Sequence, residues 1–175
     1  EKEKNEVLIF PRYHQLEVIR NLRTSVKSDG IGGNYLVQHT TGSGKSYSIG
    51  WLSHNLNTLF DKDDNKMFDS IIVITDRRVL DSQLQKTIKD LEGVEGVVKQ
   101  IDENSKQLKK YLESGGSIII TTIQKFSVVV KSIQELSGRT FGVIIDEVHS
   151  SQTGKTGLNL RKVLSINEED EVTNS

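Results

Sequence analysis

The sequence predicts an α/β fold in three layers, in which a mainly parallel β-sheet is covered by helices on both faces. Short apolar segments alternate along the chain with longer segments whose apolar residues recur at helical spacing. Such an alternation is typical of βαβ units with right-handed crossovers. The 175 residues suffice for one domain with a sizeable core, so residues 1–175 are treated as a single domain.

Two apolar runs support the sheet most strongly. Residues 71–74 and 118–120 are uninterrupted apolar runs, as expected for strands that are buried on both faces. Other strands are shorter or more mixed. The expected strands are residues 35–39, 70–75, 97–101, 117–122 and 141–146.

Amphipathic stripes predict the helices between these strands. Leu84 and Ile88, for example, belong to a stripe that runs through residues 80–91. A glycine-rich loop at 29–34 and a polar connection at 61–66 separate the early elements, and an acidic tail at 167–175 is expected to fray. The other expected helices are residues 12–28, one beginning at Lys45, 105–113, one beginning at Gln124, and 158–164.

The composition excludes several classes of protein. Without cysteine there are no disulfides and no cysteine-ligated metals, which fits a reducing cytoplasm. No apolar stretch approaches the ~20 residues of a membrane span. The net charge of −1 indicates no nucleic-acid partner by itself, so any such contact would need local patches. Since the chain does not begin with Met, we expect a piece of a longer protein.

A phosphate-binding loop is the clearest motif. Its glycines let the backbone approach phosphates, and the N-terminus of the following helix favours an anion. Lys45 would reach the β- and γ-phosphates of a nucleotide, and the Ser46 hydroxyl would bind Mg²⁺. A glycine-rich linker is the alternative, and the absence of a third glycine argues against a dinucleotide site. The loop comprises Thr41, Gly42, Ser43, Gly44, Lys45 and Ser46, with His39 at the place of the first glycine in the simplest pattern.

A carboxylate pair ends the last expected strand. Asp146 is suited to hold Mg²⁺, and Glu147 to orient and deprotonate the water that attacks the γ-phosphate. In isolation such a pair is more often a solvated turn, but its place downstream of a phosphate loop favours the functional interpretation. His149, otherwise an ordinary loop histidine, is a candidate for coupling the nucleotide site to a second ligand.

Gln15 and Arg12 are candidates for binding the base. A glutamine amide matches the donor and acceptor on the adenine edge, and a guanidinium or aromatic group nearby would stack on the ring. A polar start of a helix is an equally good explanation of Gln15.

The polar segments 75–78 and 121–125 also follow expected strands and would suit a nucleic-acid backbone. Arg77 and Arg78 would otherwise pair with Asp76 and Asp81.

Taken in order, these segments resemble the first motor domain of superfamily 2 helicase-type ATPases. More narrowly, the chain resembles the restriction (R, or HsdR) subunit of type I restriction-modification enzymes, from about residue 10 to about residue 164. Val148 stands where such subunits usually have alanine. The resemblance is carried by residues 10–15, 38–46, 74–84, 121–126 and 143–152.

The resemblance implies a RecA-like phosphate-loop ATPase that uses ATP and Mg²⁺ to translocate double-stranded DNA before a separate nuclease domain cuts it. It also implies partners: the modification and specificity subunits, and a second motor domain and the nuclease domain of the same full-length chain, in a bacterial or archaeal cytoplasm. The residue roles it implies are catalysis by Lys45, Asp146 and Glu147, adenine recognition by Gln15, metal binding by Ser46 and Asp146, and DNA-backbone contact by Arg77, Thr122 and Lys125.

Two alternatives stay open. The chain would also suit another superfamily 2 helicase that unwinds DNA, or a nucleotide-gated binding module without turnover. Glu147 argues against the module, because a pure switch has little need of a water-activating carboxylate. A motor half alone is expected to hydrolyse ATP poorly, since an arginine finger from a second domain is worth ~10³-fold or more in rate.

Overall fold

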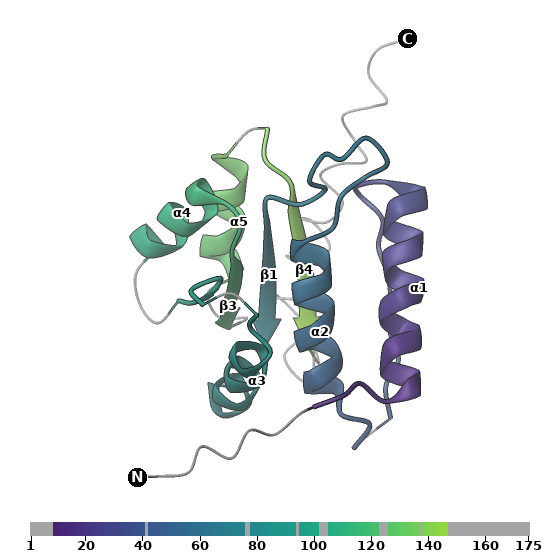
Figure 1. Ribbon diagram of the computed structural model, residues 1–175. Helices are drawn as coiled ribbons and strands as arrows, with labels where there is room; N and C mark the ends of the chain where they lie inside the picture. The colour runs from purple at the N-terminus through teal and green to yellow at the C-terminus, as the bar shows by residue number, and fades with distance from the viewer. Residues whose placement is uncertain are drawn as a thin grey trace.

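The computed structural model describes residues 9–40, 42–75, 78–93, 95–101, 105–122, 126–136 and 138–146. Within these ranges the chain forms five helices and four strands (Figure 1). The elements in chain order are α1 (Tyr13–Asp29), α2 (Lys45–Asn57), β1 (Ser70–Thr75), α3 (Arg78–Asp90), β2 (Val98–Gln100), α4 (Ser105–Ser114), β3 (Ile118–Thr122), α5 (Phe126–Gln134) and β4 (Phe141–Asp146).

The four strands form one parallel sheet in the order β2-β3-β1-β4. Strands β1 and β3 lie at the centre and are buried along their whole length, as their uninterrupted apolar runs predict. The register places Thr75 of β1 beside Thr122 of β3 and Asp146 of β4, so three polar residues stand side by side where the strands end.

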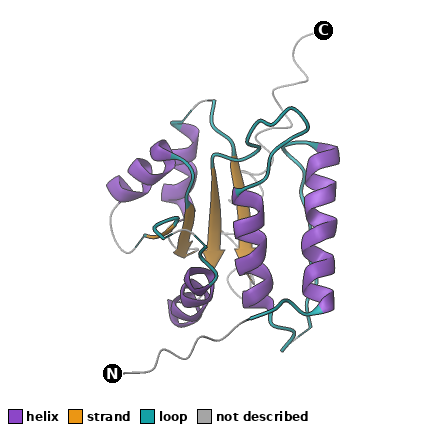
Figure 2. Cartoon of the chain, in the orientation of Figure 1, coloured by secondary structure: helices purple, strands orange, loops and turns teal. Residues whose placement is uncertain are grey.

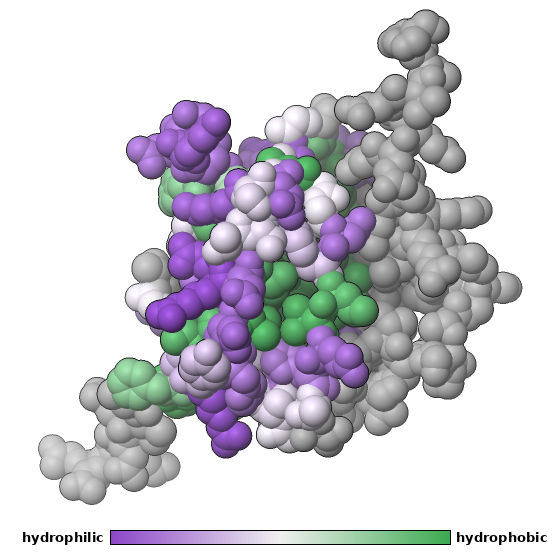
Figure 3. Space-filling model, turned by 90° about the vertical axis from the view of Figure 1, so that its right-hand side faces the viewer, coloured by the Kyte–Doolittle hydropathy of each residue, from purple (hydrophilic) through white to green (hydrophobic). Residues whose placement is uncertain are grey.

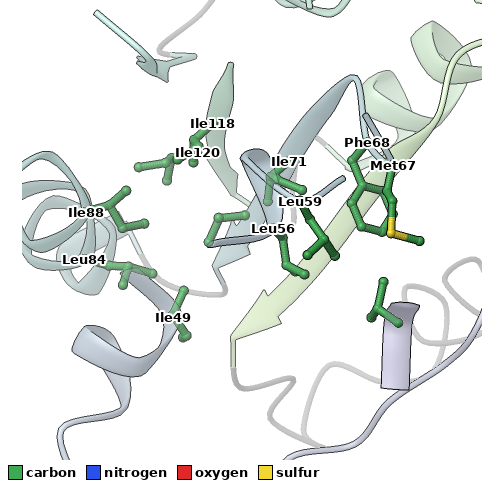
Figure 4. Packing of buried hydrophobic residues seen from close by; sticks show 12 residues of the cluster. Ile49, Leu56, Leu59, Met67, Phe68, Ile71, Leu84, Ile88, Ile118 and Ile120 are labelled. Carbon is green, nitrogen blue, oxygen red and sulfur yellow. The ribbon is translucent and has the colours of Figure 1, made fainter. Parts of the chain in front are cut away.

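Helices cover both faces of the sheet, which confirms the expected three-layer α/β fold (Figure 2). Because side chains alternate along a strand, Ile71 and Val73 point to one face and Ile72 and Ile74 to the other. The first face packs against α1, α2 and α3, and the second against α4 and α5. Figure 4 shows residues of the first cluster, which come from the helices, from the central strands and from the segment between α2 and β1 that carries Leu59, Met67 and Phe68.

Close packing of α2 on α3 fixes the helix that follows the phosphate loop. A Cβ on Gly50 would lie 2.8 Å from Leu91 Cδ1, so a side chain here would force Leu91 to shift. The His54 ring adds a hydrogen bond from Nε2 to the Ile88 carbonyl at 2.9 Å. The start of α2 lies beside the carboxyl end of β4, where Lys45 contacts Asp146.

The expected strand at residues 35–39 is wrong. This segment is described and forms no strand, and Leu36 is 98% exposed. Its apolar run of three residues follows a glycine-rich loop, and here those side chains gain no burial that would hold the segment against β4 at the edge of the sheet. Figure 3 views the molecule from the side of α1, and the surface on this side carries hydrophobic residues (green) beside hydrophilic ones (purple).

The other predicted helices and strands begin and end within two residues of the observed ones, wherever the structure describes the end in question. The expected helix at 158–164 and the acidic tail at 167–175 lie outside the described residues. Among the described helices, none combines the length and the apolar character that a membrane span requires.

Candidate nucleotide-binding site

The candidate site lies where three strands end and two helices begin. The arrowheads of β1 and β4 and the starts of α1 and α2 point to the same end of the molecule (Figure 1). Thr75, Thr122 and Asp146 continue the alternation of the sheet face that α2 covers. The carboxyl edge of a parallel sheet is where open α/β folds bind ligands.

An ion pair joins the two principal motifs. Lys45 Nζ, from the first residue of α2, lies 2.8 Å from Asp146 Oδ1 at the end of β4. The two side chains are 29% and 12% exposed, respectively, so the pair is partly withdrawn from solvent. A carboxylate this poorly hydrated is costly to leave without a partner, and the lysine charge offsets that cost. Residues far apart in the sequence are thus brought into direct contact.

The phosphate loop has the backbone conformation that an anion site needs. Gly42 and Gly44 adopt left-handed φ angles of 78° and 79°. Ser43 N–H donates to the Thr40 carbonyl at 3.2 Å and closes the turn. The Gly44 carbonyl accepts the Tyr47 and Ser48 N–H groups at 3.0 and 3.2 Å and begins α2. The first N–H groups of any helix have no acceptor one turn earlier, which makes this end suitable for phosphate.

Gln15 holds the phosphate loop against α1. Its side chain is 3% exposed, and its Nε2 donates to the Ser43 carbonyl at 3.2 Å and the Gly44 carbonyl at 3.0 Å. Its Oε1 accepts the Arg12 backbone N–H at 2.8 Å. A Cβ on Gly44 would lie 2.5 Å from Gln15 Nε2 and would displace the amide, and the left-handed φ of 79° also favours glycine here. Adenine recognition by Gln15 stays a prediction, and it would require the amide to exchange these partners.

Two histidines that the sequence arguments gave no role also contact the loop. His14 Nε2 lies 3.0 Å from the Ser43 carbonyl oxygen, and His39 Nδ1 lies 3.2 Å from Ser43 Oγ. Burial lowers the pKa of His39, and the nearby charges of His14 and Lys45 lower it further. Only their positions in the sequence could have identified these two histidines, because His14 adjoins Gln15 and His39 occupies the place of a glycine.

The other predicted site residues differ in their exposure to solvent, and some lie outside the described part of the chain. Thr122 is only 8% exposed in the row beside Thr75, which leaves little of its surface for a DNA backbone. Arg12 is exposed at the start of α1, where its side chain is accessible to a base. The predicted residues that lie outside the described part of the chain are Thr41, Arg77, Lys125, Glu147 and His149.

The described residues fit a magnesium nucleotide. Magnesium prefers a few hard oxygen ligands and completes its shell with phosphate oxygens and water. Ser46, in the first turn of α2, and Asp146 would supply a hydroxyl and a carboxylate. Within the described ranges no group of three histidine, cysteine or acidic side chains forms a metal site made of protein alone.

The curated relatives include endonuclease subunits of type I restriction enzymes. The subunit from Staphylococcus aureus (strain COL) is 28% identical over 156 residues, 87% of this chain and 16% of the relative. The HindI subunit from Haemophilus influenzae is 33% identical over 138 residues, 76% of this chain and 12% of the relative. The ATP-dependent helicase Lhr-Core from Methanothermobacter thermautotrophicus is 29% identical over 147 residues, 74% of this chain and 17% of the relative.

These figures mean that the chain spans a small part of each of these relatives. A family model described as the SWI2/SNF2 ATPase matches residues 14–168, a range that contains both Lys45 and Asp146. The parallel sheet with helices on both faces is consistent with the RecA-like domain of such ATPases. The chain therefore belongs to the SWI2/SNF2 ATPase family.

Proposed function

We propose that this chain is the first, ATP-binding motor domain of a type I restriction endonuclease subunit. In that role it drives ATP-dependent translocation of double-stranded DNA before cleavage by a nuclease domain elsewhere in the full-length protein. The observation that carries the proposal is the 2.8 Å contact between Lys45 and Asp146, made beside a left-handed glycine loop at the start of a helix. The similarity to type I endonuclease subunits supports the choice among ATPases.

Nucleotide binding would exchange the partners of the ion pair. Lys45 would then turn from Asp146 to the β- and γ-phosphates, and backbone N–H groups of the loop and of the first turn of α2 would hold the phosphate oxygens. Ser46 and Asp146 are the residues that would hold Mg²⁺, and the ion would supply charge neutralisation at the phosphates. Lys45 and Asp146 would each keep a partner of opposite charge in this poorly hydrated site.

Activation of the water that attacks the γ-phosphate is the role proposed for Glu147, the residue after Asp146. Glu147 would orient and deprotonate the attacking water, as the pattern of the two acids predicts. The second motor domain would supply an arginine finger, worth ~10³-fold or more in rate. We therefore expect this chain alone to bind MgATP and turn it over slowly.

The DNA contacts are proposed at the same edge of the sheet. Arg77 and Lys125 would touch the phosphate backbone and His149 would couple that contact to the nucleotide site. Thr122, being 8% exposed, would contribute through its backbone or after a local rearrangement. The modification and specificity subunits are the proposed partners of the full-length protein, because the similar bacterial proteins are subunits of type I restriction enzymes.

Steady-state ATP hydrolysis by this chain, with and without linear duplex DNA at one fixed salt concentration, tests the proposal. We expect measurable MgATP binding with little turnover in both conditions. Robust turnover by the chain alone would contradict its role as half of a motor. In the full-length protein we expect DNA-stimulated turnover that Glu147→Gln abolishes, and turnover that survives this change would remove Glu147 from the mechanism.

A second candidate function is that of a DNA-unwinding helicase. It is favoured by the 29% identity to an archaeal helicase of the Lhr-Core type. A strand-displacement assay on the full-length protein separates the two functions, because the proposed translocase would move duplex DNA whereas a helicase would separate its strands. ATP-dependent release of a labelled strand would support the helicase.

A further inference from the structure

We propose that His14 and His39 are positioning residues that hold the phosphate loop in its nucleotide-binding shape through Ser43. This inference rests on the proposed function, because it assigns two further residues to the same nucleotide site. Both histidines lie outside the set that would touch phosphate or metal. They approach Ser43 from different parts of the chain, His14 from the start of α1 and His39 from the segment before the loop.

The His14 contact fixes the orientation of a peptide group. A carbonyl oxygen can only accept a hydrogen bond, so His14 must carry its hydrogen on Nε2 and donate it to the Ser43 carbonyl at 3.0 Å. Gln15 Nε2 donates to the same oxygen at 3.2 Å. In a trans peptide the C=O and the following N–H point in opposite directions. Holding the Ser43 carbonyl toward α1 therefore turns the Gly44 N–H away from α1.

The His39 contact fixes the side chain of the same residue. His39 Nδ1 and Ser43 Oγ lie 3.2 Å apart, and the Ser43 N–H bonds to the Thr40 carbonyl at 3.2 Å. These two links close the turn that leads from residue 39 into the loop. A glycine at position 39 would offer no side chain for the first link, so histidine here adds a restraint that the simplest loop pattern lacks.

Together the two contacts constrain a segment that glycines on both sides leave flexible. Ser43 stands between Gly42 and Gly44, which both adopt left-handed φ angles. Glycine loses more conformational freedom on ordering than any other residue. If the loop were held only by the ligand, binding would carry that ordering cost, whereas a loop already held by His14 and His39 avoids it.

The test is isothermal titration of this chain with MgATP, comparing His14→Ala and His39→Ala with the unaltered protein. Each change removes one hydrogen bond, and we expect affinity to fall by roughly three- to tenfold. The rescuing variants are His14→Gln and His39→Asn, which place an amide nitrogen near the lost Nε2 or Nδ1. We expect them to recover most of the affinity.

A matched control is His54→Ala. His54 also bonds a backbone carbonyl, that of Ile88, but at the junction of α2 and α3. We expect this change to lower the melting temperature while leaving the MgATP affinity of the folded protein unchanged. The melting temperature of each variant without nucleotide separates loss of folding from loss of positioning.

A double-mutant cycle with Ser43→Ala sharpens the assignment. Since His39 bonds the Ser43 hydroxyl, the effects of His39→Ala and Ser43→Ala should be less than additive. Since His14 bonds the main chain, the effects of His14→Ala and Ser43→Ala should add.

Unchanged affinity in both alanine variants, or losses that the amide variants do not recover, would overturn the inference and leave the proposed function standing. Failure of the unaltered chain to bind MgATP would overturn the proposed function, and the inference with it.

Discussion

The two ends of the same parallel strands each carry an aspartate, and the two aspartates are held very differently. At the amino end, Asp69 accepts the Thr140 N–H at 2.8 Å, the Thr140 hydroxyl at 3.2 Å and Arg139 Nη1 at 3.2 Å. Its own backbone N–H and carbonyl bond to Thr140 and Gly116 at 2.7 and 2.6 Å. The starts of β1, β3 and β4 are thereby tied together.

At the carboxyl end, Asp146 faces one lysine among the described residues, Lys45 at 2.8 Å. Asp69 is thus held by Thr140 and Arg139, whereas the contact described for Asp146 is with one lysine side chain. Several contacts within the fold suit a residue that stabilises it. An ion pair with a lysine that could turn to an anionic ligand would suit the ligand-binding role proposed for Asp146. Among the described contacts, the kind of partner distinguishes the two aspartates.

Lys45→Ala gives the largest expected effect on the functional edge. Hydrogen bonds to charged groups are worth about 1.5–3 kcal/mol, so MgATP affinity should fall by roughly ten- to a hundredfold. Isothermal titration measures it. Lys66→Ala, at an exposed lysine in the 61–66 connection, is the control and should bind normally. Equal MgATP affinity in Lys45→Ala and the unaltered chain would contradict the ligand-binding role proposed for the Lys45–Asp146 pair.

Gly44→Ala should disturb the same edge through the backbone. A left-handed φ costs a residue with a Cβ about 1–2 kcal/mol, and the new Cβ would also displace Gln15. We expect a lower melting temperature together with MgATP affinity reduced by about tenfold. Gly116→Ala is matched to it, because Gly116 has a φ of 73° with no atom within 4 Å of an added Cβ. That control should lose stability alone.

Asp69→Ala should affect stability and spare binding. It removes the acceptor for the Thr140 N–H and the partner of Arg139, so we expect the free energy of unfolding to fall by about 1–2 kcal/mol. Denaturant titration measures the loss, and MgATP affinity of the folded variant should be unchanged. Asp69→Asn keeps an acceptor and should lose less. A binding defect in Asp69→Ala would show that the two edges are coupled.

The pH dependence of stability gives the smallest expected effect. Burial would raise the pKa of Asp69, but the hydrogen bonds from Thr140 and the charge of Arg139 outweigh it and lower the pKa below its ordinary value of 3.8. A lowered folded-state pKa means that the contribution is complete above 3.8 and is lost as pH falls through the folded-state value. Melting temperatures of the unaltered chain and Asp69→Asn should therefore converge at acid pH. A constant difference would contradict this pKa direction.

Much of the fold was predictable because its signals are local. The runs at 70–75 and 141–146 were predicted with the bounds that β1 and β4 have, because each is a mainly apolar segment that ends at a polar residue, Thr75 or Asp146. Strand β1 is buried along its whole length, whereas β4 lies at the edge of the sheet and is only partly buried. The stripe containing Leu84 and Ile88 likewise marked the buried side of α3. The segment 35–39 failed because three apolar residues satisfy the pattern of a strand without specifying a neighbour to pair with.

The candidate site was only partly predictable. The motif around Lys45 and the acid at Asp146 were identifiable from residue type and order, and the structure brings them into contact. The sequence did not predict the partners of the Gln15 amide or the contacts of His14 and His39 with Ser43. A glutamine or histidine side chain serves many roles, so its type alone does not identify a partner. In the case of Gln15, the partner Ser43 also lies about 28 residues away.

The sequence by itself determined the α/β class, the phosphate loop and the carboxylate at the end of the last described strand. Those features depend on periodicity and on residues adjacent in the chain. Only the tertiary structure decided that Asp146 pairs with Lys45, that Gln15 holds the loop, and that His14 and His39 converge on Ser43. The physical reason is that the contacts of Asp146, Gln15 and His14 join segments distant in sequence, and packing of α1 against α2 sets which groups come within hydrogen-bonding distance. His39 lies only four residues before Ser43, but their contact depends on the turn that the loop makes.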